Sequence, residues 1–254
     1  MGKYKIQSRE HDRNFIETQS YRRLLKTFNI LRSKRGNIIH VCGAPGTGKS
    51  INIFTAQEKL GLDFYEVKLI LPRSNITSRD VFDLMIKSME EDLEVNPKEK
   101  LLKHLKKFDA IVFADQFHDY HLVDNESVGF SQWTDFMGLK TFNFYFICIL
   151  EYLKHWKDFQ DINLVLQTAW RIRFRGKKED LFTDMGLFSK SALILLKILF
   201  NVVEISYSEK EAISIVKSHL KDVDEDLIRQ YVKKYRCKPR FICQAIKKDQ
   251  KNSI

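Results

Sequence analysis

The chain has 254 residues, of which 44% are hydrophobic and 30% are charged, and its net charge is +10. This length is enough for one sizeable α/β domain and a small second one. The longest apolar run, residues 142–150, is too short to cross a bilayer, and the first residues lack the apolar core of a signal peptide. We therefore expect an intracellular protein without a membrane partner, cytoplasmic in a prokaryote and nuclear in a eukaryote.

The cysteines, at positions 42, 148, 237 and 243, form no C-x-x-C pair. This spacing argues against a zinc site and against a disulfide framework. It agrees with reduced thiols inside a cell.

Positive charge is concentrated in parts of the chain. The first forty residues carry ten Lys or Arg against three Asp or Glu, and the last thirty are rich in Lys. A further basic cluster consists of Arg171, Arg173, Arg175, Lys177 and Lys178. Such fields attract nucleic acid, and a solvated lysine-rich surface has the same composition, so both interpretations stay open.

The N-terminal part is predicted to contain a helix, a strand and a second helix. Residues 1–14 are expected to be flexible. Apolar residues recur at helical spacing from Phe15 to Leu31 and predict the first helix. Residues 37–42 then have the pattern of a short buried strand, and residues 51–60 the pattern of a helix.

The eight residues between this strand and this helix match the phosphate-binding P-loop, G-x-x-x-x-G-K-[ST]. They are Gly43, Ala44, Pro45, Gly46, Thr47, Gly48, Lys49 and Ser50. Glycines let the backbone turn successive N–H groups toward a phosphate, and the helix N-terminus adds its positive dipole end. Lys49 can reach the β- and γ-phosphates, and the Ser50 hydroxyl can bind Mg²⁺. The motif therefore predicts a site for ATP or ADP with Mg²⁺.

Strand and helix patterns alternate through the middle of the chain. Strands are predicted at residues 64–70, 110–114, 162–168 and 202–205, and helices at 80–89, 98–107, 146–159 and 186–200. This alternation is typical of a parallel sheet with helices on both faces. We therefore expect an α/β fold, the three-layer αβα core of a P-loop NTPase, over residues 1–206.

Residues 207–254 show helical patterns only. Ser208 and Glu211 have the spacing of a capping box, Asp224 can cap a second helix, and Pro239 can open a third. Three short amphipathic helices predict a small helical lid.

Hydrolysis of ATP needs more than a P-loop, namely a carboxylate at the end of a neighbouring strand that holds Mg²⁺. Asp115 closes the strand pattern at 110–114 and is the candidate Walker B residue, which would hold Mg²⁺ together with Ser50. Gln116 follows it, where ATPases of this layout usually have a Glu that polarises the attacking water. An amide can orient a water molecule but cannot accept its proton. The sequence therefore predicts ATP binding with slow hydrolysis.

Three further positions are candidates for contact with phosphates. Thr168, or Gln167 before it, could touch the γ-phosphate, and Thr168 could equally cap the end of its strand. Arg171 or Arg173 could act as an arginine finger on the ATP of a neighbouring subunit, or could bind a phosphate backbone. Arg240, in the first turn of the last helix, could sense the γ-phosphate and couple the lid to the nucleotide.

With these residues the chain resembles an AAA+ ATPase, and within that class the origin-recognition and replication-licensing ATPases of archaea and eukaryotes. The P-loop is the most specific part of the resemblance. Residues 8–16 are similar to the box that opens the subfamily, residues 203–212 to the last core strand and the start of the lid, and residues 238–240 to the sensor-2 turn. The resemblance implies a nucleotide-dependent switch in DNA replication initiation or another DNA-associated assembly, formed with copies of itself or with related subunits.

The chain also departs from the pattern of that subfamily. Gln116 replaces a Glu, Thr168 stands where an Asn is expected, and Cys237 stands where a Gly is more usual. The resemblance stops before the winged-helix domain, so we expect any DNA recognition to come from the core or from a partner. The alternative function is a degenerate ATPase scaffold or a signalling ATPase, which holds ATP structurally and works through protein–protein contacts.

Overall fold

The computed structural model describes residues 12–67, 77–107, 110–114, 134–135, 143–169, 171–174, 177–220 and 222–252. Within these ranges, no helix is long and apolar enough to cross a membrane.

The centre of the molecule is a five-stranded sheet in which every pairing is parallel. Its strand order is β2 (Phe64–Glu66), β3 (Ile111–Ala114), β5 (Leu164–Thr168), β1 (Ile38–Cys42) and β8 (Asn201–Glu204). The P-loop strand β1 therefore lies between β5 and β8, and β3 lies on the far side of β5. All carboxyl ends meet at one edge of the sheet, which is where ligands bind in open α/β folds.

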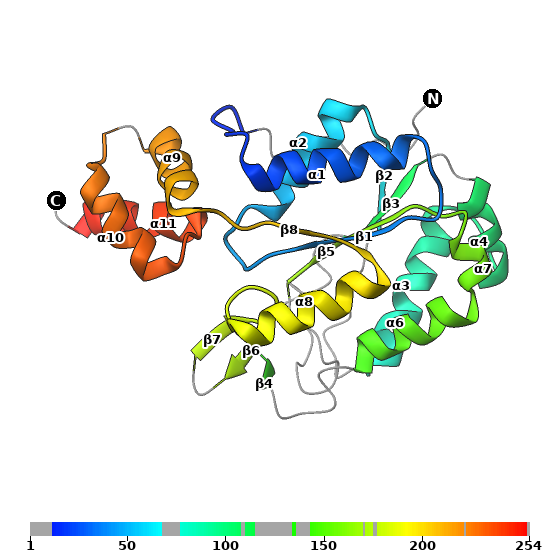
Figure 1. The fold of residues 1–254 in the computed structure, drawn as a ribbon. Helices are drawn as coiled ribbons and strands as arrows, with labels where there is room; N and C mark the ends of the chain where they lie inside the picture. The colour runs from blue at the N-terminus through cyan, green and yellow to red at the C-terminus, as the bar shows by residue number, and fades with distance from the viewer. Residues whose placement is uncertain are drawn as a thin grey trace.

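Helices cover both faces of this sheet (Figure 1). On one face lie α1 (Gln19–Asn29), continued by the 3₁₀ turn η1 (Ile30–Arg32), and α2 (Lys49–Leu60). On the other lie α3 (Ser78–Asp92), α6 (Asn143–Lys154) and α8 (Leu187–Leu199), with α4 (Lys98–Lys107) and α7 (Trp156–Phe159) near the sheet edge. Tyr21, Phe28, Phe54 and Phe113 belong to the core between the sheet and α1 and α2. The predicted three-layer αβα fold is confirmed.

The helix predicted at residues 146–159 is wrong in one respect, because the structure has two helices there. His155 leaves the helical conformation, with φ −113° and ψ 25°, and separates α6 from α7. Both helices continue the same apolar spacing, so the pattern alone did not reveal the break at a single residue.

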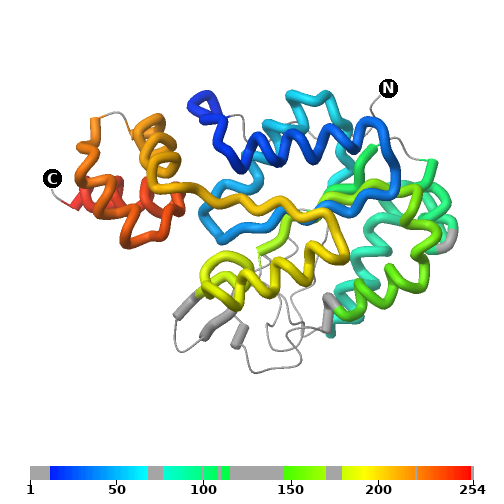
Figure 2. The backbone as a smooth tube through the Cα atoms, in the orientation of Figure 1, coloured from blue at the N-terminus to red at the C-terminus, as the bar shows by residue number. Residues whose placement is uncertain are grey.

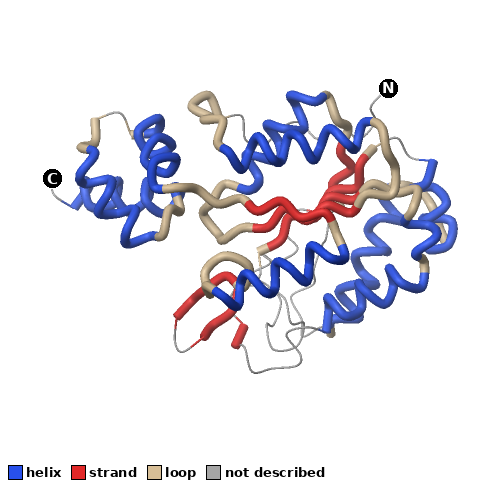
Figure 3. The backbone as a smooth tube through the Cα atoms, in the orientation of Figure 1, coloured by secondary structure: helices blue, strands red, loops and turns tan. Residues whose placement is uncertain are grey.

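The three C-terminal helices α9 (Glu209–His219), α10 (Glu225–Tyr235) and α11 (Pro239–Asn252) pack around a core of their own, which we call the C-terminal bundle. Figure 3 shows it beside the sheet as helices joined by short loops. The predicted caps are present: Ser208 and Glu211 form a capping box, Asp224 accepts from two backbone N–H groups, and Pro239 is the first residue of α11.

A second, small sheet was not predicted. It consists of β4 (Thr134–Asp135), β6 (Arg171–Phe174) and β7 (Lys177–Asp180), with β6 and β7 antiparallel. In Figure 1 its strands β6 and β7 lie near the start of α8. Figure 2 shows the course of the chain from β8 into the C-terminal bundle. Charged residues dominate this hairpin, so it lacks the apolar alternation on which strand prediction depends. Arg171 and Arg173 both belong to β6.

Candidate functional site

The P-loop connects β1 directly to α2, as its motif predicts. Gly46 and Gly48 have φ angles of +86° and +76°, in the left-handed region that glycine adopts without strain. Thr47 closes the loop on itself, since its hydroxyl donates to the Ala44 carbonyl oxygen at 2.8 Å. Ser50 lies in the first turn of α2. The N-terminus of α2 and the backbone of the loop thus have the arrangement that the P-loop motif predicts for phosphate binding.

Lys49 is buried and its ammonium group lies back against the loop. Nζ donates to the carbonyl oxygen of Gly43 at 2.7 Å and to that of Ala44 at 3.3 Å. Asp180, the last residue of β7, is fully buried near this charge. Burial raises the pKa of the Asp180 carboxyl to about 6, while the charge of Lys49 acts in the opposite direction.

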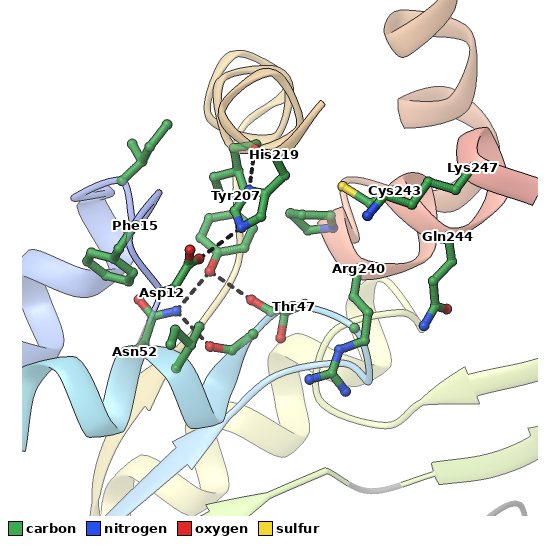
Figure 4. Close-up of a pocket in the computed structure, with 16 residues that line it drawn as sticks. Asp12, Phe15, Thr47, Asn52, Tyr207, His219, Arg240, Cys243, Gln244 and Lys247 are labelled. Carbon is green, nitrogen blue, oxygen red and sulfur yellow. Dashed lines mark hydrogen bonds and ion pairs between the residues drawn. The ribbon is translucent and has the colours of Figure 1, made fainter. Parts of the chain in front are cut away.

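Tyr207, in the segment between β8 and α9, is attached to the P-loop (Figure 4). Its hydroxyl donates to the Thr47 carbonyl oxygen at 2.7 Å. Asn52 of α2 donates through Nδ2 to the Tyr207 oxygen at 3.0 Å and to the Gly48 carbonyl oxygen at 2.8 Å. Burial raises the pKa of Tyr207 to about 12, so the phenol stays protonated and keeps this donor role.

A cavity of about 480 Å³ lies between the P-loop, the N-terminal segment and the C-terminal bundle. Apolar side chains line one part, and the polar lining side chains include Asp12, Asn52, His219, Arg240, Gln244 and Lys247. Nε2 of His219 in α9 lies 2.9 Å from Oδ2 of Asp12 in the N-terminal segment, within hydrogen-bond distance. Three parts of the chain that are distant in sequence therefore meet at this cavity.

Arg240 lies where the sequence analysis expected it, in the first turn of α11. Its backbone N–H donates to the Gly46 carbonyl oxygen at 3.2 Å. Its neighbour Phe241 lies against Gly46 so closely that a Cβ there would come within 3.0 Å of the ring. Figure 4 shows the Arg240 side chain extending from α11 toward the loop and the sheet. The bundle is thus in direct contact with the P-loop.

Thr168 lies beside the P-loop strand, opposite Cys42 at the end of β5. Its hydroxyl oxygen is 3.2 Å from Nδ1 of His40, so in this structure it contacts β1. Gln167 precedes it, and Oε1 of this side chain is buried without a hydrogen-bond partner. The two candidates therefore differ, since the Thr168 hydroxyl has a partner on β1 whereas Oε1 of Gln167 has none.

For the other predicted residues, the structure describes no side-chain contact with the P-loop. Asp115 and Gln116 lie outside the described residues, directly after β3. Arg171 and Arg173 are placed on the β6 backbone. Among the described residues, no group of three or more His, Cys, Asp or Glu has the arrangement of a metal site.

Sequence reasoning missed three residues of the site, Asn52, Asp180 and Tyr207. Asn52 could have been identified from its position two residues after the motif, in the first turns of α2. Tyr207 had a weak signal, as the aromatic residue between a strand and a capping box. Asp180 had none, because it is one carboxylate in a charged hairpin.

Comparison with models of protein families finds no match, and neither does comparison with curated proteins. Among solved structures, the chain is similar to AMPPCP-bound DnaA from Aquifex aeolicus, with 19% sequence identity and a TM-score of 0.35. The match covers 86% of this chain and 57% of the DnaA chain, so the chain spans little more than half the length of that structure. A TM-score of this size carries no argument about fold or function. The fold assignment therefore rests on the parallel sheet, its strand order and the P-loop between β1 and α2.

Proposed function

We propose that this protein is an AAA+ type switch that binds ATP or ADP with Mg²⁺. The observation that carries the proposal is the position of the P-loop, which faces the C-terminal bundle across a cavity and contacts it through Arg240 and Phe241. Backbone N–H groups of the loop would bind the phosphates, and the cavity of about 480 Å³ would receive the base and sugar.

The roles of the side chains follow from their positions. Lys49 would leave the Gly43 carbonyl oxygen and move to the β- and γ-phosphates. Ser50 would bind Mg²⁺ through its hydroxyl, with Asp115 as the carboxylate near the metal. Arg240 would contact the γ-phosphate from the side of the bundle, and Thr168 would reach it from β5. Gln116 would keep hydrolysis slow, because it cannot accept a proton from water.

The contacts between bundle and loop explain how a nucleotide would change the protein. Phosphate bound to the N–H groups of the loop would draw Lys49 away. It would also shift the backbone whose Thr47 and Gly46 carbonyl oxygens accept from Tyr207 and Arg240. The same bundle is joined to the start of α1, since the Gln19 N–H donates to the Glu211 carboxylate at 2.8 Å. A movement of the bundle would therefore reach the start of α1.

The exposed face of α1 and the turn after it supports a DNA-associated role. No Asp or Glu occurs between Glu17 and Glu58. The exposed cations of this surface are Arg22, Arg23, Lys26, Arg32, Lys34 and Arg35. A cationic ridge without intervening carboxylates fits the phosphate backbone of a nucleic acid. We infer that DNA is held here, in an assembly with copies of this chain or with related subunits in which Arg171 or Arg173 would act as the finger.

Nucleotide binding is tested by titrating a fluorescent ATP analogue with Mg²⁺ into the protein and into Lys49→Ala, and by measuring turnover in parallel. We expect the affinity to fall at least ten-fold in the variant, with little turnover in either protein and higher turnover in Gln116→Glu. Equal affinities of the protein and Lys49→Ala would contradict the proposal.

DNA binding is tested by its salt dependence in Arg23→Ser/Lys26→Ser, with Lys233→Ser/Lys234→Ser on the exposed face of α10 as a control of equal charge. Each phosphate contact contributes about one unit to the slope of log K against log salt, so we expect the slope to drop by about two only in the α1 variant. ATP binding without any salt-dependent DNA binding would favour the alternative function, a scaffold that works through protein partners.

A further inference from the structure

The short segment that joins β7 to α8 has an internal structure held by two carboxylates. We call it the connector; it runs from Asp180 to Gly186. Oδ1 of Asp180 accepts from the Phe182 N–H at 3.0 Å and from the Thr183 hydroxyl at 3.1 Å. The Asp180 N–H donates to Oδ2 of Asp184 at 3.1 Å. These bonds fix both carboxylates relative to each other.

The turn between α10 and α11 is bound to this connector by two cations. Nζ of Lys238 donates to Oδ2 of Asp184 at 2.7 Å, and both side chains are largely buried. Arg236 donates to the Asp184 carbonyl oxygen at 3.2 Å and to the Glu179 carboxylate at 3.4 Å. Arg236 adopts a left-handed conformation, with φ 52°, and so does Cys237, with φ 55°. The turn that contains these two left-handed residues is therefore the part of the bundle that makes the contacts with the connector.

The connector also reaches the P-loop. Phe182 is buried against Cys42, the last residue of β1 and the one before Gly43. Nζ of Lys49 donates to the carbonyl oxygen of Gly43, the residue after Cys42, at 2.7 Å. Asp180 is fully buried, and the charge of Lys49 favours the ionised form of its carboxyl. A buried carboxylate needs such a counter-charge, because desolvation disfavours its ionised form.

We propose that the connector is the seat on which the C-terminal bundle docks, and that Asp180 and Asp184 are positioning residues that couple the bundle to the P-loop lysine. The seat itself follows from the contacts of Asp184 with Arg236 and Lys238, whereas its coupling to nucleotide rests on the proposed function. When phosphate draws Lys49 away, Asp180 loses its counter-charge inside the protein. The connector then rearranges, and Asp184 carries the change to the turn between α10 and α11.

The seat is tested without nucleotide by hydrogen exchange of the backbone amides at residues 236–242. Arg240 is an internal reporter, since its N–H is bonded to Gly46. Asp184→Asn and Lys238→Met are each expected to raise the exchange rate at least ten-fold, and the double variant no further than the worse single one. Glu225→Gln, which breaks the exposed ion pair with Lys217 within the bundle, is the control and is expected to change little. Additive effects of the two single variants, or no effect of either, would refute the proposal that the bundle docks on the connector.

The coupling is tested with Asp180→Asn. The amide oxygen can still accept from Phe182 and Thr183, so this variant keeps the geometry of the connector and removes only the charge. We expect ATP with Mg²⁺ to change the exchange of residues 236–242 in the unmodified protein, and to change it at least three-fold less in Asp180→Asn although ATP still binds. An equal change in both proteins would overturn the coupling. If the protein binds no ATP, the proposed function is refuted instead. The nucleotide-free exchange measurements would still test whether the bundle docks on the connector.

Discussion

The hydroxyl of Tyr207 donates a 2.7 Å hydrogen bond to the carbonyl oxygen of Thr47, so the segment that enters the C-terminal bundle is bonded to the backbone of the P-loop. Asn52 holds the same hydroxyl from α2. A side chain outside the motif therefore fixes the conformation of the motif. This bond connects the anion site to the part of the molecule expected to move.

Removing this hydroxyl in Tyr207→Phe leaves the Thr47 carbonyl and one Asn52 N–H without their partner. We expect the free energy of unfolding to fall by roughly 1–3 kcal/mol, the cost of unpaired buried polar groups. ATP affinity should fall roughly three- to ten-fold because the loop is less well fixed. Urea unfolding and nucleotide titration measure both effects. Tyr235→Phe, at the half-buried last residue of α10, is the control, and an equal loss in both variants would count against a special role of Tyr207.

The sequence was most informative where one pattern decides the structure. The P-loop, the apolar strand patterns and the caps at Ser208 and Asp224 depend on neighbouring residues, and all were predicted with the correct element. The strand order of the sheet and the hairpin of β6 and β7 depend on pairings between distant segments. The single-residue break at His155 is equally invisible in a periodic apolar pattern.

The candidate site divides in the same way. The residues of the motif and Arg240 were identified from local spacing. Tyr207 forms a hydrogen bond with a residue more than a hundred positions away, Asp180 interacts electrostatically with another, and neither belongs to a motif. Their roles became readable only when their partners Thr47 and Lys49 were located in space.

Gly46 and Gly61 provide a matched pair for the contact between bundle and loop. Both have positive φ angles, so substitution by Ala strains either backbone by about 1–2 kcal/mol. A Cβ at Gly46 also meets the Phe241 ring at 3.0 Å, whereas nothing lies within 4 Å at Gly61. We expect similar losses of stability from the backbone in both variants, with faster amide exchange at the start of α11 and weaker ATP binding only in Gly46→Ala. If Gly61→Ala also lost ATP binding, backbone strain at the end of α2 would be enough to weaken binding, and the contact with Phe241 would not be needed to explain it.

Asn163 holds the turn after α1 against the sheet. Its Oδ1 accepts from the Asn37 N–H at 3.1 Å, and its Nδ2 donates to the carbonyl oxygens of Leu31 and Lys34 at 3.3 and 3.0 Å. Asn163→Ala leaves these groups unpaired, so we expect roughly 2–4 kcal/mol of lost stability in urea unfolding. Asn201→Ala, at the exposed start of β8, should change it by less than about 0.5 kcal/mol. An equally small loss of stability in Asn163→Ala would mean that water replaces the hydrogen bonds of the Asn163 side chain at no cost.

His40 gives the protein a pH dependence whose sign follows from its burial. Burial lowers the pKa of this imidazole from 6.5 to about 4. Below pH 6.5 the unfolded chain takes up a proton at His40, and the folded protein does not until about pH 4. The stability that a neutral buried His40 provides is therefore complete above pH 6.5 and is lost as the pH falls toward 4. The shift corresponds to roughly 3 kcal/mol at most.

His40→Gln removes this titration and keeps a polar side chain beside Thr168. We expect the unmodified protein to lose roughly 2–3 kcal/mol more than the variant between pH 8 and pH 4.5, in urea unfolding at a series of pH values. Every other titrating group is common to both proteins, so its contribution cancels in the difference. Parallel stability curves for the two proteins would show that His40 is solvated, and would contradict its position on β1 beside Thr168 and the Phe200 ring.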